Sequence, residues 1–229
     1  MLRHMAPTGP LAALAFLTTV TFSRWASAIQ VASPPPPRSL VRPTYVLAFF
    51  GDSLTDTGNT LRVAGVPDPA VYYKGRYTDG PNWVDRLKST LVKKHKVKVF
   101  NYAYGGATAC PSPLISGTYP FVKDLSNQTE AFLADLKNGR IPYGKDVKTL
   151  PIQYIGSNDV TNTLGAAMLS GAALDAGQVQ SLVRSIAACR LQWAKTLSAA
   201  GMRDIVMLPM VPMHMAPKVP AAYKPLVLQ

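Results

Sequence analysis

Residues 46–59 read VLAFFGDSLTDTGN, a fully apolar run that changes abruptly into small, polar, turn-forming residues. Five consecutive apolar residues before Gly51 indicate a strand that is buried on both faces, as in a parallel sheet covered by helices. In such sheets, ligands bind beyond the carboxyl ends of the strands. The stretch therefore predicts an α/β fold in which the first strand delivers Ser53 to a ligand-binding edge.

Two later stretches also follow short apolar runs, NYAYGGAT at residues 101–108 and IGSND at residues 155–159. If each lies at the carboxyl end of a strand, the three stretches bring a serine, a glycine N–H and an asparagine amide into one crevice. Taken singly, Ser53 could cap a helical turn, Gly106 could mark a bend, and Asn158 could fix its own loop. The ordered combination favours a common site over three separate structural roles.

With these stretches in order, the chain resembles the GDSL esterase/lipase family, also called SGNH hydrolases. The segment GRYTDGPNWV at residues 75–84 is similar to a further family segment, and the resemblance covers residues 45–217. It implies a flavodoxin-like three-layer sandwich whose parallel strands are ordered two, one, three, four, five. It also implies that Ser53 is the catalytic nucleophile, and that the N–H groups of Ser53 and Gly106 and the amide of Asn158 form the oxyanion hole.

The family's last block, Asp-x-x-His, supplies the rest of its catalytic triad and has no counterpart here. His4 lies in the predicted leader, and His95 precedes the second predicted strand, at the edge opposite Ser53. His214 follows the fourth predicted strand, at the correct edge, but Val211 stands where the pattern requires Asp. His214 is therefore a candidate base, with an ordinary surface-loop position as the alternative. The chain is expected to lack the last strand and helix of the fold.

Apolar periodicity predicts strands that alternate with helices, which implies parallel pairing through right-handed crossovers. Strands are expected at 45–50, 97–101, 150–155 and 205–208, and helices at 82–94, 127–138 and 176–200. The segment 161–177, which is rich in Ala and Gly, is interpreted as a mobile loop.

Residues 1–28 are predicted to be a secretory signal peptide, because basic residues precede a short apolar core and residues 26–28 form a small-x-small cleavage site. The apolar core is shorter than the roughly 20 residues that span a membrane, which favours cleavage over anchoring. Residues 29–42 are proline-rich and predict an extended linker. Residues 43–229 are predicted to form one hydrolase domain, and the protein is expected to be secreted.

The formal net charge of +12 falls to +10 without the two arginines of the leader. The dense basic cluster at 93–98 has no interleaved aromatic residues, so we expect no nucleic-acid binding, while peripheral attraction to anionic surfaces stays open. Cys110 and Cys189 could pair in an oxidising compartment, but a buried free thiol on an apolar helix face is the favoured interpretation of Cys189. Asn127 begins a glycosylation sequon.

These features predict a serine esterase or lipase that hydrolyses carboxylic esters, of a lipid or an acetylated carbohydrate, through an acyl-serine intermediate. We expect no metal, no cofactor, and a monomer that acts on a small-molecule or polymer-borne ester. The alternative is a non-catalytic ester- or glycan-binding protein that retains the pocket without the base. Without the last block, this chain is expected to hydrolyse simple esters far more slowly than an intact relative, with only the residual acceleration from the oxyanion hole and binding.

Overall fold

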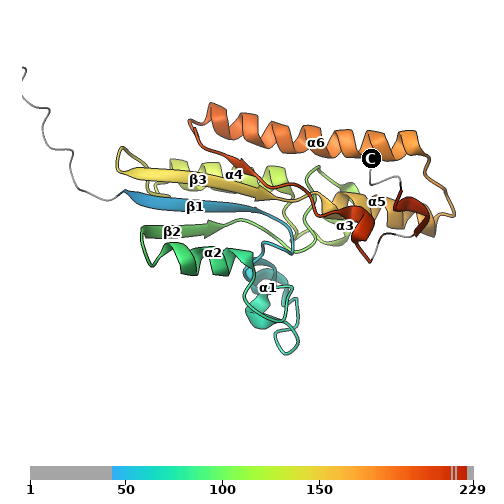
Figure 1. Ribbon diagram of the computed structural model, residues 1–229, viewed down its shortest axis with the longest axis horizontal. Helices are drawn as coiled ribbons and strands as arrows, with labels where there is room; N and C mark the ends of the chain where they lie inside the picture. Colours follow the sequence, from blue (N-terminus) through green and yellow to red (C-terminus); the bar gives the residue numbers. More distant parts are fainter. Residues whose placement is uncertain (1–42, 218, 220, 226–229) are drawn as a thin grey trace, which may run out of the picture. The chain divides into compact units, whose positions relative to one another are not determined.

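The computed structural model of the protein describes residues 43–217, 219 and 221–225, so the predicted signal peptide and linker lie outside the described residues. Its sheet consists of β1 (Thr44–Gly51), β2 (Lys96–Asn101), β3 (Val147–Tyr154) and β4 (Val206–Met207). All neighbouring strands pair in parallel, in the order β2-β1-β3-β4 (Figure 1). The α/β class and the predicted order of the first four strands are confirmed.

Helices pack on both faces of this sheet and make the predicted three layers. They are α1 (Asn59–Ala64), α2 (Trp83–Leu91), α3 (Pro113–Thr118), α4 (Leu125–Lys137), α5 (Ser157–Leu169) and α6 (Ala176–Ala199), with short 3₁₀ turns η2 (Tyr73–Gly75), η3 (Met213–Met215) and η4 (Ala221–Tyr223). Side chains of α2 pack with one set of β1 residues, and side chains of α4 and α6 pack with the alternate set.

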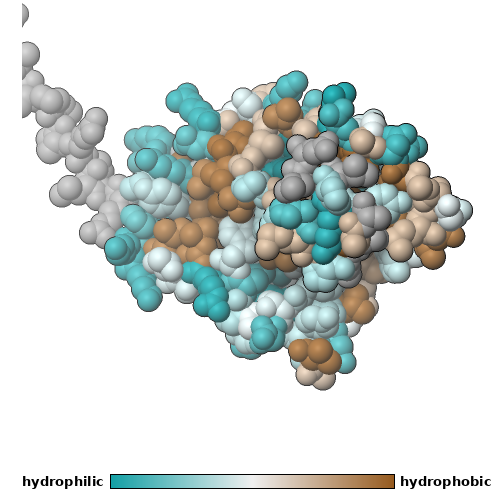
Figure 2. Space-filling view, turned by 45° about the vertical axis from the view of Figure 1, so that its right-hand side comes forward, coloured by the Kyte–Doolittle hydropathy of each residue, from teal (hydrophilic) through white to brown (hydrophobic). Residues whose placement is uncertain are grey.

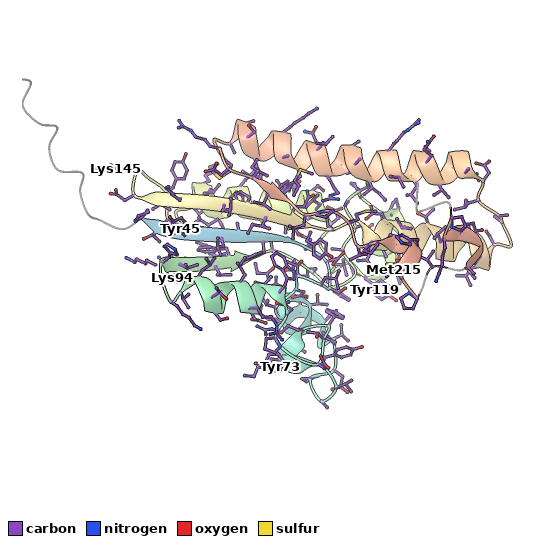
Figure 3. The ribbon with its side chains drawn as sticks, viewed as in Figure 1. Tyr45, Tyr73, Lys94, Tyr119, Lys145 and Met215 are labelled. Carbon is purple, nitrogen blue, oxygen red and sulfur yellow. A yellow bond between two sulfur atoms is a disulfide. The ribbon has the colours of Figure 1, made fainter. Side chains whose placement is uncertain are left out.

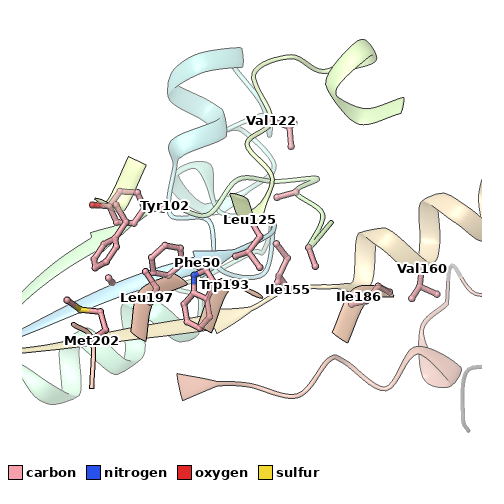
Figure 4. Packing of buried hydrophobic residues seen from close by; sticks show 14 of the residues in the cluster. Phe50, Tyr102, Val122, Leu125, Ile155, Val160, Ile186, Trp193, Leu197 and Met202 are labelled. Carbon is pink, nitrogen blue, oxygen red and sulfur yellow. The ribbon is translucent and has the colours of Figure 1, made fainter. Parts of the chain in front are cut away.

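The end of β1 is held by aromatic packing around Phe50, which is fully buried (Figure 4). The Phe50 ring meets those of Phe132 and Trp193 edge to face, with centroids 5.4 and 5.2 Å apart, and stacks on Tyr102 at 5.5 Å. On the opposite face, Phe49 meets Trp83 of α2. Because aromatic packing of this kind holds both faces, β1 ends in a rigid part of the molecule, just before Ser53.

The prediction of a mobile loop over residues 161–177 is wrong for its first half, because α5 continues to Leu169. Alanine is the strongest helix former, and Val160, Leu164 and Ala167 bury one side of this helix. The composition of this segment therefore led to a wrong prediction of a loop, because the side of α5 opposite the buried residues carries small and polar residues. The short helices α1 and α3 were not predicted either.

The interpretation of Cys189 as a free thiol is also wrong, because Cys110 and Cys189 form a disulfide with a Cα–Cα distance of 5.4 Å. The carboxylate of Asp159 accepts hydrogen bonds from the N–H groups of Ala109 and Cys110, at 2.8 and 3.0 Å. These bonds hold the loop before α3 in place, so that Cys110 meets Cys189 of α6.

Basic side chains gather at the amino ends of the strands. Figure 3 shows Lys94 and Lys145 at one end of the sheet and Tyr119 and Met215 toward the other. The basic cluster thus lies away from the edge that carries Ser53. In the part of the chain that the structure describes, no helix has the length and apolar character to cross a bilayer.

Candidate active site

Ser53 lies in a tight turn two residues after the end of β1. The N–H groups of Thr55 and Asp56 both donate to the carbonyl of Asp52, at 3.0 and 2.9 Å. Before the turn, a Cβ on Gly51 would lie 2.6 Å from the Tyr154 carbonyl oxygen, so the close approach of β1 and β3 requires glycine there. The half-buried Ser53 is thereby fixed beyond the carboxyl end of the strand.

Two hydrogen bonds bring the three predicted stretches together. The Ser157 hydroxyl donates to Oδ2 of Asp52, beside Ser53, at 2.9 Å. Nδ2 of Asn158 donates to the carbonyl of Ala107, the residue after Gly106, at 2.8 Å. Ser53, Gly106 and Asn158 therefore belong to three loops that are hydrogen-bonded to one another at a single edge of the sheet.

The hydrogen-bond donors of these three residues are largely unused. Among the described residues, neither the N–H of Ser53 nor that of Gly106 donates to a protein acceptor. The Asn158 amide uses one of its two N–H bonds on Ala107. Gly106 has a φ of +83°, a left-handed conformation that favours glycine. The arrangement can stabilise an oxygen on which negative charge develops.

The positions of the three histidines decide which of them could act as a general base for Ser53. His214 lies half-buried in η3, and within residues 43–217 no hydrogen bond joins a histidine to Ser53. His95 is exposed at the start of β2, with its ring 5.1 Å from that of Tyr45, at the edge opposite Ser53 as predicted. His4 lies outside the described residues. In the part of the chain that the structure describes, no histidine is therefore hydrogen-bonded to Ser53 as a base would be.

Comparison with known proteins identifies the family. The sequence model of GDSL-like lipases and acylhydrolases matches residues 47–226, most of the chain. The chain belongs to the GDSL-like lipase/acylhydrolase family.

Two individual proteins are also similar to this family member. The phosphatidylcholine-sterol acyltransferase of Aeromonas hydrophila is 32% identical over 117 residues, which are 49% of this chain and 32% of the relative. This GDSL-family chain thus matches about a third of that protein. Among solved structures, an alpha/beta hydrolase enzyme from the metagenome of Lake Arreo, Spain, aligns with a TM-score of 0.40 and 14% identity, over 80% of this chain and 68% of the other.

A buried carboxylate that the sequence analysis missed, Asp56, supports the candidate site. Its oxygens accept from the N–H groups of Gly58, Asn59 and Thr60 at 2.7 to 3.1 Å and from the Thr60 hydroxyl at 2.5 Å. They also accept from the N–H of Gly105 at 3.1 Å. Asp56 is fully buried and so ties the loop after β1 to the residue before Gly106.

The GDSL-family segment 75–84 supports the same loop. Nδ2 of Asn82 donates to the Asp56 carbonyl at 3.0 Å, and Nε1 of Trp83 donates to the Thr55 hydroxyl at 3.3 Å. The Tyr77 ring packs against Gly105, where a Cβ would lie 2.2 Å from ring atoms. This contact explains why glycine precedes Gly106.

Two further carboxylates, those of Asp52 and Asp159, fix loops through hydrogen bonds from backbone N–H groups. Asp52 accepts from the N–H of Leu54 at 3.0 Å as well as from Ser157. Burial raises the pKa of Asp52 from 3.8 to about 6, and it raises the pKa of Asp159 above the ordinary value. No three His, Cys, Asp or Glu side chains of the described residues gather as a metal site.

Proposed function

We propose that the protein hydrolyses carboxylic esters through an acyl-serine intermediate, with Ser53 as the nucleophile. The observation that carries this proposal is that, within the described residues, the N–H groups of Ser53 and Gly106 donate to no protein acceptor, in loops joined to that of the Asn158 amide. Acyl transfer to serine requires a nucleophile together with donors where the carbonyl oxygen becomes negative. Membership of a lipase/acylhydrolase family supports the same chemistry.

In this proposal, Oγ of Ser53 attacks the ester carbonyl carbon, and the serine proton passes to a general base. The tetrahedral oxyanion accepts hydrogen bonds from the three donors, and the base gives its proton to the departing alkoxide, which leaves as the alcohol. Water then attacks the acyl-serine, its proton passes through the base to Oγ of Ser53, and the carboxylic acid is released. His214 is the candidate base from the sequence, but we do not assign this role to it, because it makes no hydrogen bond to Ser53 in the described chain.

Labelling with a fluorophosphonate probe tests the nucleophile. We expect wild type to be labelled, Ser53→Ala to be unlabelled, and Ser89→Ala, an exposed serine of α2, to be labelled normally. We expect Asn158→Ala to lower kcat by about 100-fold to 1000-fold, the usual effect of removing one oxyanion donor. A wild-type protein that the probe does not label would contradict the proposal and favour a non-catalytic ester-binding protein.

The substrate is a small-molecule or polymer-borne ester in this proposal. The similar Aeromonas protein is named an acyltransferase, so an added alcohol that competes with water tests for acyl transfer. A transesterified product in proportion to the alcohol would show that this chain transfers acyl groups, and free acid alone would show that it hydrolyses esters.

We also propose that residues 1–28 are a signal peptide, that the protein is secreted, and that Asn127 carries a glycan. Asn127 is exposed near the start of α4. Thr129 of the sequon is buried and its hydroxyl donates to the Leu125 carbonyl, so glycosylation has to precede folding. Endoglycosidase treatment of the secreted protein should shift its mobility, and Asn127→Gln should abolish the shift.

A further inference from the structure

A groove lies along α5, the helix whose second residue is Asn158. Its volume of about 580 Å³ falls within the range of small-molecule sites, roughly 300 to 1,000 Å³. One side is Leu114 of α3, and α3 and α5 lie at the same end of the sheet (Figure 1). The rest of the lining comes from the α5 helix and its end, namely Thr161, Asn162, Gly165, Ala166, Leu169 and Ser170.

Helix geometry places Asn158 at the head of this groove. An α-helix has about 3.6 residues per turn, so Asn158, Asn162, Gly165 and Leu169 follow one another along one side of α5. Residues 160, 164 and 167 lie on the buried side of the same helix. The side that holds the candidate oxyanion donor therefore continues directly into the groove.

The chemistry of the lining indicates the kind of ligand. The chain has a net charge of +12, yet the described residues that line the groove include no charged side chain. Leu114 and Leu169 are 58% and 93% exposed, which is an unfavourable arrangement for large apolar side chains unless something covers them. Figure 2, which brings this end of the molecule forward, shows hydrophobic side chains at the surface among hydrophilic ones. The groove suits an uncharged apolar chain.

We propose that the groove binds the acyl chain of the ester, so that the enzyme prefers esters of longer apolar carboxylic acids over acetates. The proposal rests on the function proposed above. An ester whose carbonyl oxygen accepts from Asn158 has its first acyl carbon at the first turn of α5. From Asn162 to Leu169 the helix rises about 10 Å, which is enough to accommodate several methylene groups.

Gly165→Leu tests the groove because it fills the floor without straining the helix. A Cβ at Gly165 meets nothing within 4 Å, and glycine-to-larger substitutions within helices gain in helix propensity. Gly117→Leu is the matched control, since Gly117 is an exposed glycine of α3 with equally open space and does not line the groove.

The first measurement is kcat/KM for p-nitrophenyl acetate and p-nitrophenyl octanoate. Each buried methylene is worth roughly fourfold in affinity. If the leucine side chain of Gly165→Leu takes the place of two or more methylenes of the acyl chain, kcat/KM for the octanoate ester falls about tenfold or more. Acetate hydrolysis should stay within about twofold, and Gly117→Leu should match wild type for both esters. Equal losses on acetate and octanoate would overturn the proposal, as would no loss on octanoate. Alkyl acetates of rising alcohol length form a second series, and an effect confined to that series would assign the groove to the alcohol instead.

The second measurement does not depend on catalysis. Decanoate binding is followed by calorimetry in Ser53→Ala and in Ser53→Ala combined with Gly165→Leu or Gly117→Leu. We expect the Gly165→Leu combination alone to weaken binding about tenfold or more. Unchanged binding would refute the groove even if the esterase is active. Selective loss of decanoate binding in a protein without esterase activity would refute the proposed function and leave the groove assignment standing.

Discussion

Replacement of Asp56 by Asn is expected to destabilise the protein far more than a typical carboxylate-to-amide substitution. Asp56 is fully buried, and four backbone N–H groups and one hydroxyl donate to its two oxygens. Asn keeps the size and shape of the side chain but presents only one acceptor oxygen. The substitution therefore turns the second oxygen position into a donor that faces other donors.

The magnitude follows from how the five donors are divided. Oδ1 accepts from Gly58 and Asn59, and Oδ2 accepts from the Thr60 N–H, the Thr60 hydroxyl and Gly105. Asn therefore loses at least two hydrogen bonds to a charged acceptor, at about 1.5 to 3 kcal/mol each, or about 3 to 6 kcal/mol together. That is a large part of the roughly 5 to 15 kcal/mol by which domains are stable.

Urea unfolding followed by tryptophan fluorescence measures this loss. The control is Asp68→Asn, because Asp68 is exposed and accepts one hydrogen bond from the Ala70 N–H. We expect the control to lie within about 0.5 kcal/mol of wild type. An Asp56→Asn variant whose free energy of unfolding lies within about 1 kcal/mol of wild type would refute the role given to this carboxylate.

Four further outcomes are expected. The pKa of Asp52 in the folded protein is raised from 3.8 to about 6, so the folded state favours the protonated carboxyl. The free energy of unfolding of wild type should therefore fall by about 3 kcal/mol relative to that of Asp52→Asn as the pH rises from about 4 to about 6, as measured by denaturant unfolding at each pH. A variant with Cys110 and Cys189 both replaced by Ser should be less stable to urea by about 4 to 5 kcal/mol, because the disulfide spans 79 residues of chain; a difference below about 1 kcal/mol would contradict a disulfide in solution. Gly51→Ala should lower the free energy of unfolding by about 1 to 3 kcal/mol, because its Cβ would overlap the Tyr154 carbonyl oxygen. His214→Ala should reduce p-nitrophenyl acetate hydrolysis less than about tenfold, whereas a loss of about 10,000-fold would identify His214 as the base.

Most of the sheet could be predicted from the sequence because its strands are short apolar runs that end in turn-forming residues. Burial on both faces leaves such a run no other stable environment, so β1 and β3 are visible without knowledge of their neighbours. The helix α5 was missed because Ala and Gly were taken as loop formers. Its helical state depends on the burial of Val160, Leu164 and Ala167 against other elements, which composition does not reveal.

That Ser53, Gly106 and Asn158 lie in loops at one edge of the sheet could be predicted, but the groups that support these loops could not. The Gln128 side chain accepts from the Gly51 N–H and donates to the Gly51 carbonyl, both at 2.9 Å, across a separation of 77 residues. Asp56 reaches Gly105 across 49 residues. Neither pair has a local sequence pattern, because the fold alone places the partners together. The sequence signal for Asp56 was its position in the polar loop after β1, which also suits an ordinary turn.

These supporting groups explain how the candidate site can keep N–H groups that have no acceptor among the described residues. Ser53 and Gly106 are half-buried, and in a flexible loop their N–H groups could turn towards protein carbonyls. The loops cannot rotate in this way, because Asp56 holds Gly105, Asn158 holds Ala107, and Asp52 holds Leu54 and Ser157. Hydrogen bonds to charged or amide side chains of neighbouring residues therefore hold the donors of Ser53 and Gly106 in place. Loss of these bonds should therefore weaken oxyanion stabilisation even where Ser53, Gly106 and Asn158 are unchanged.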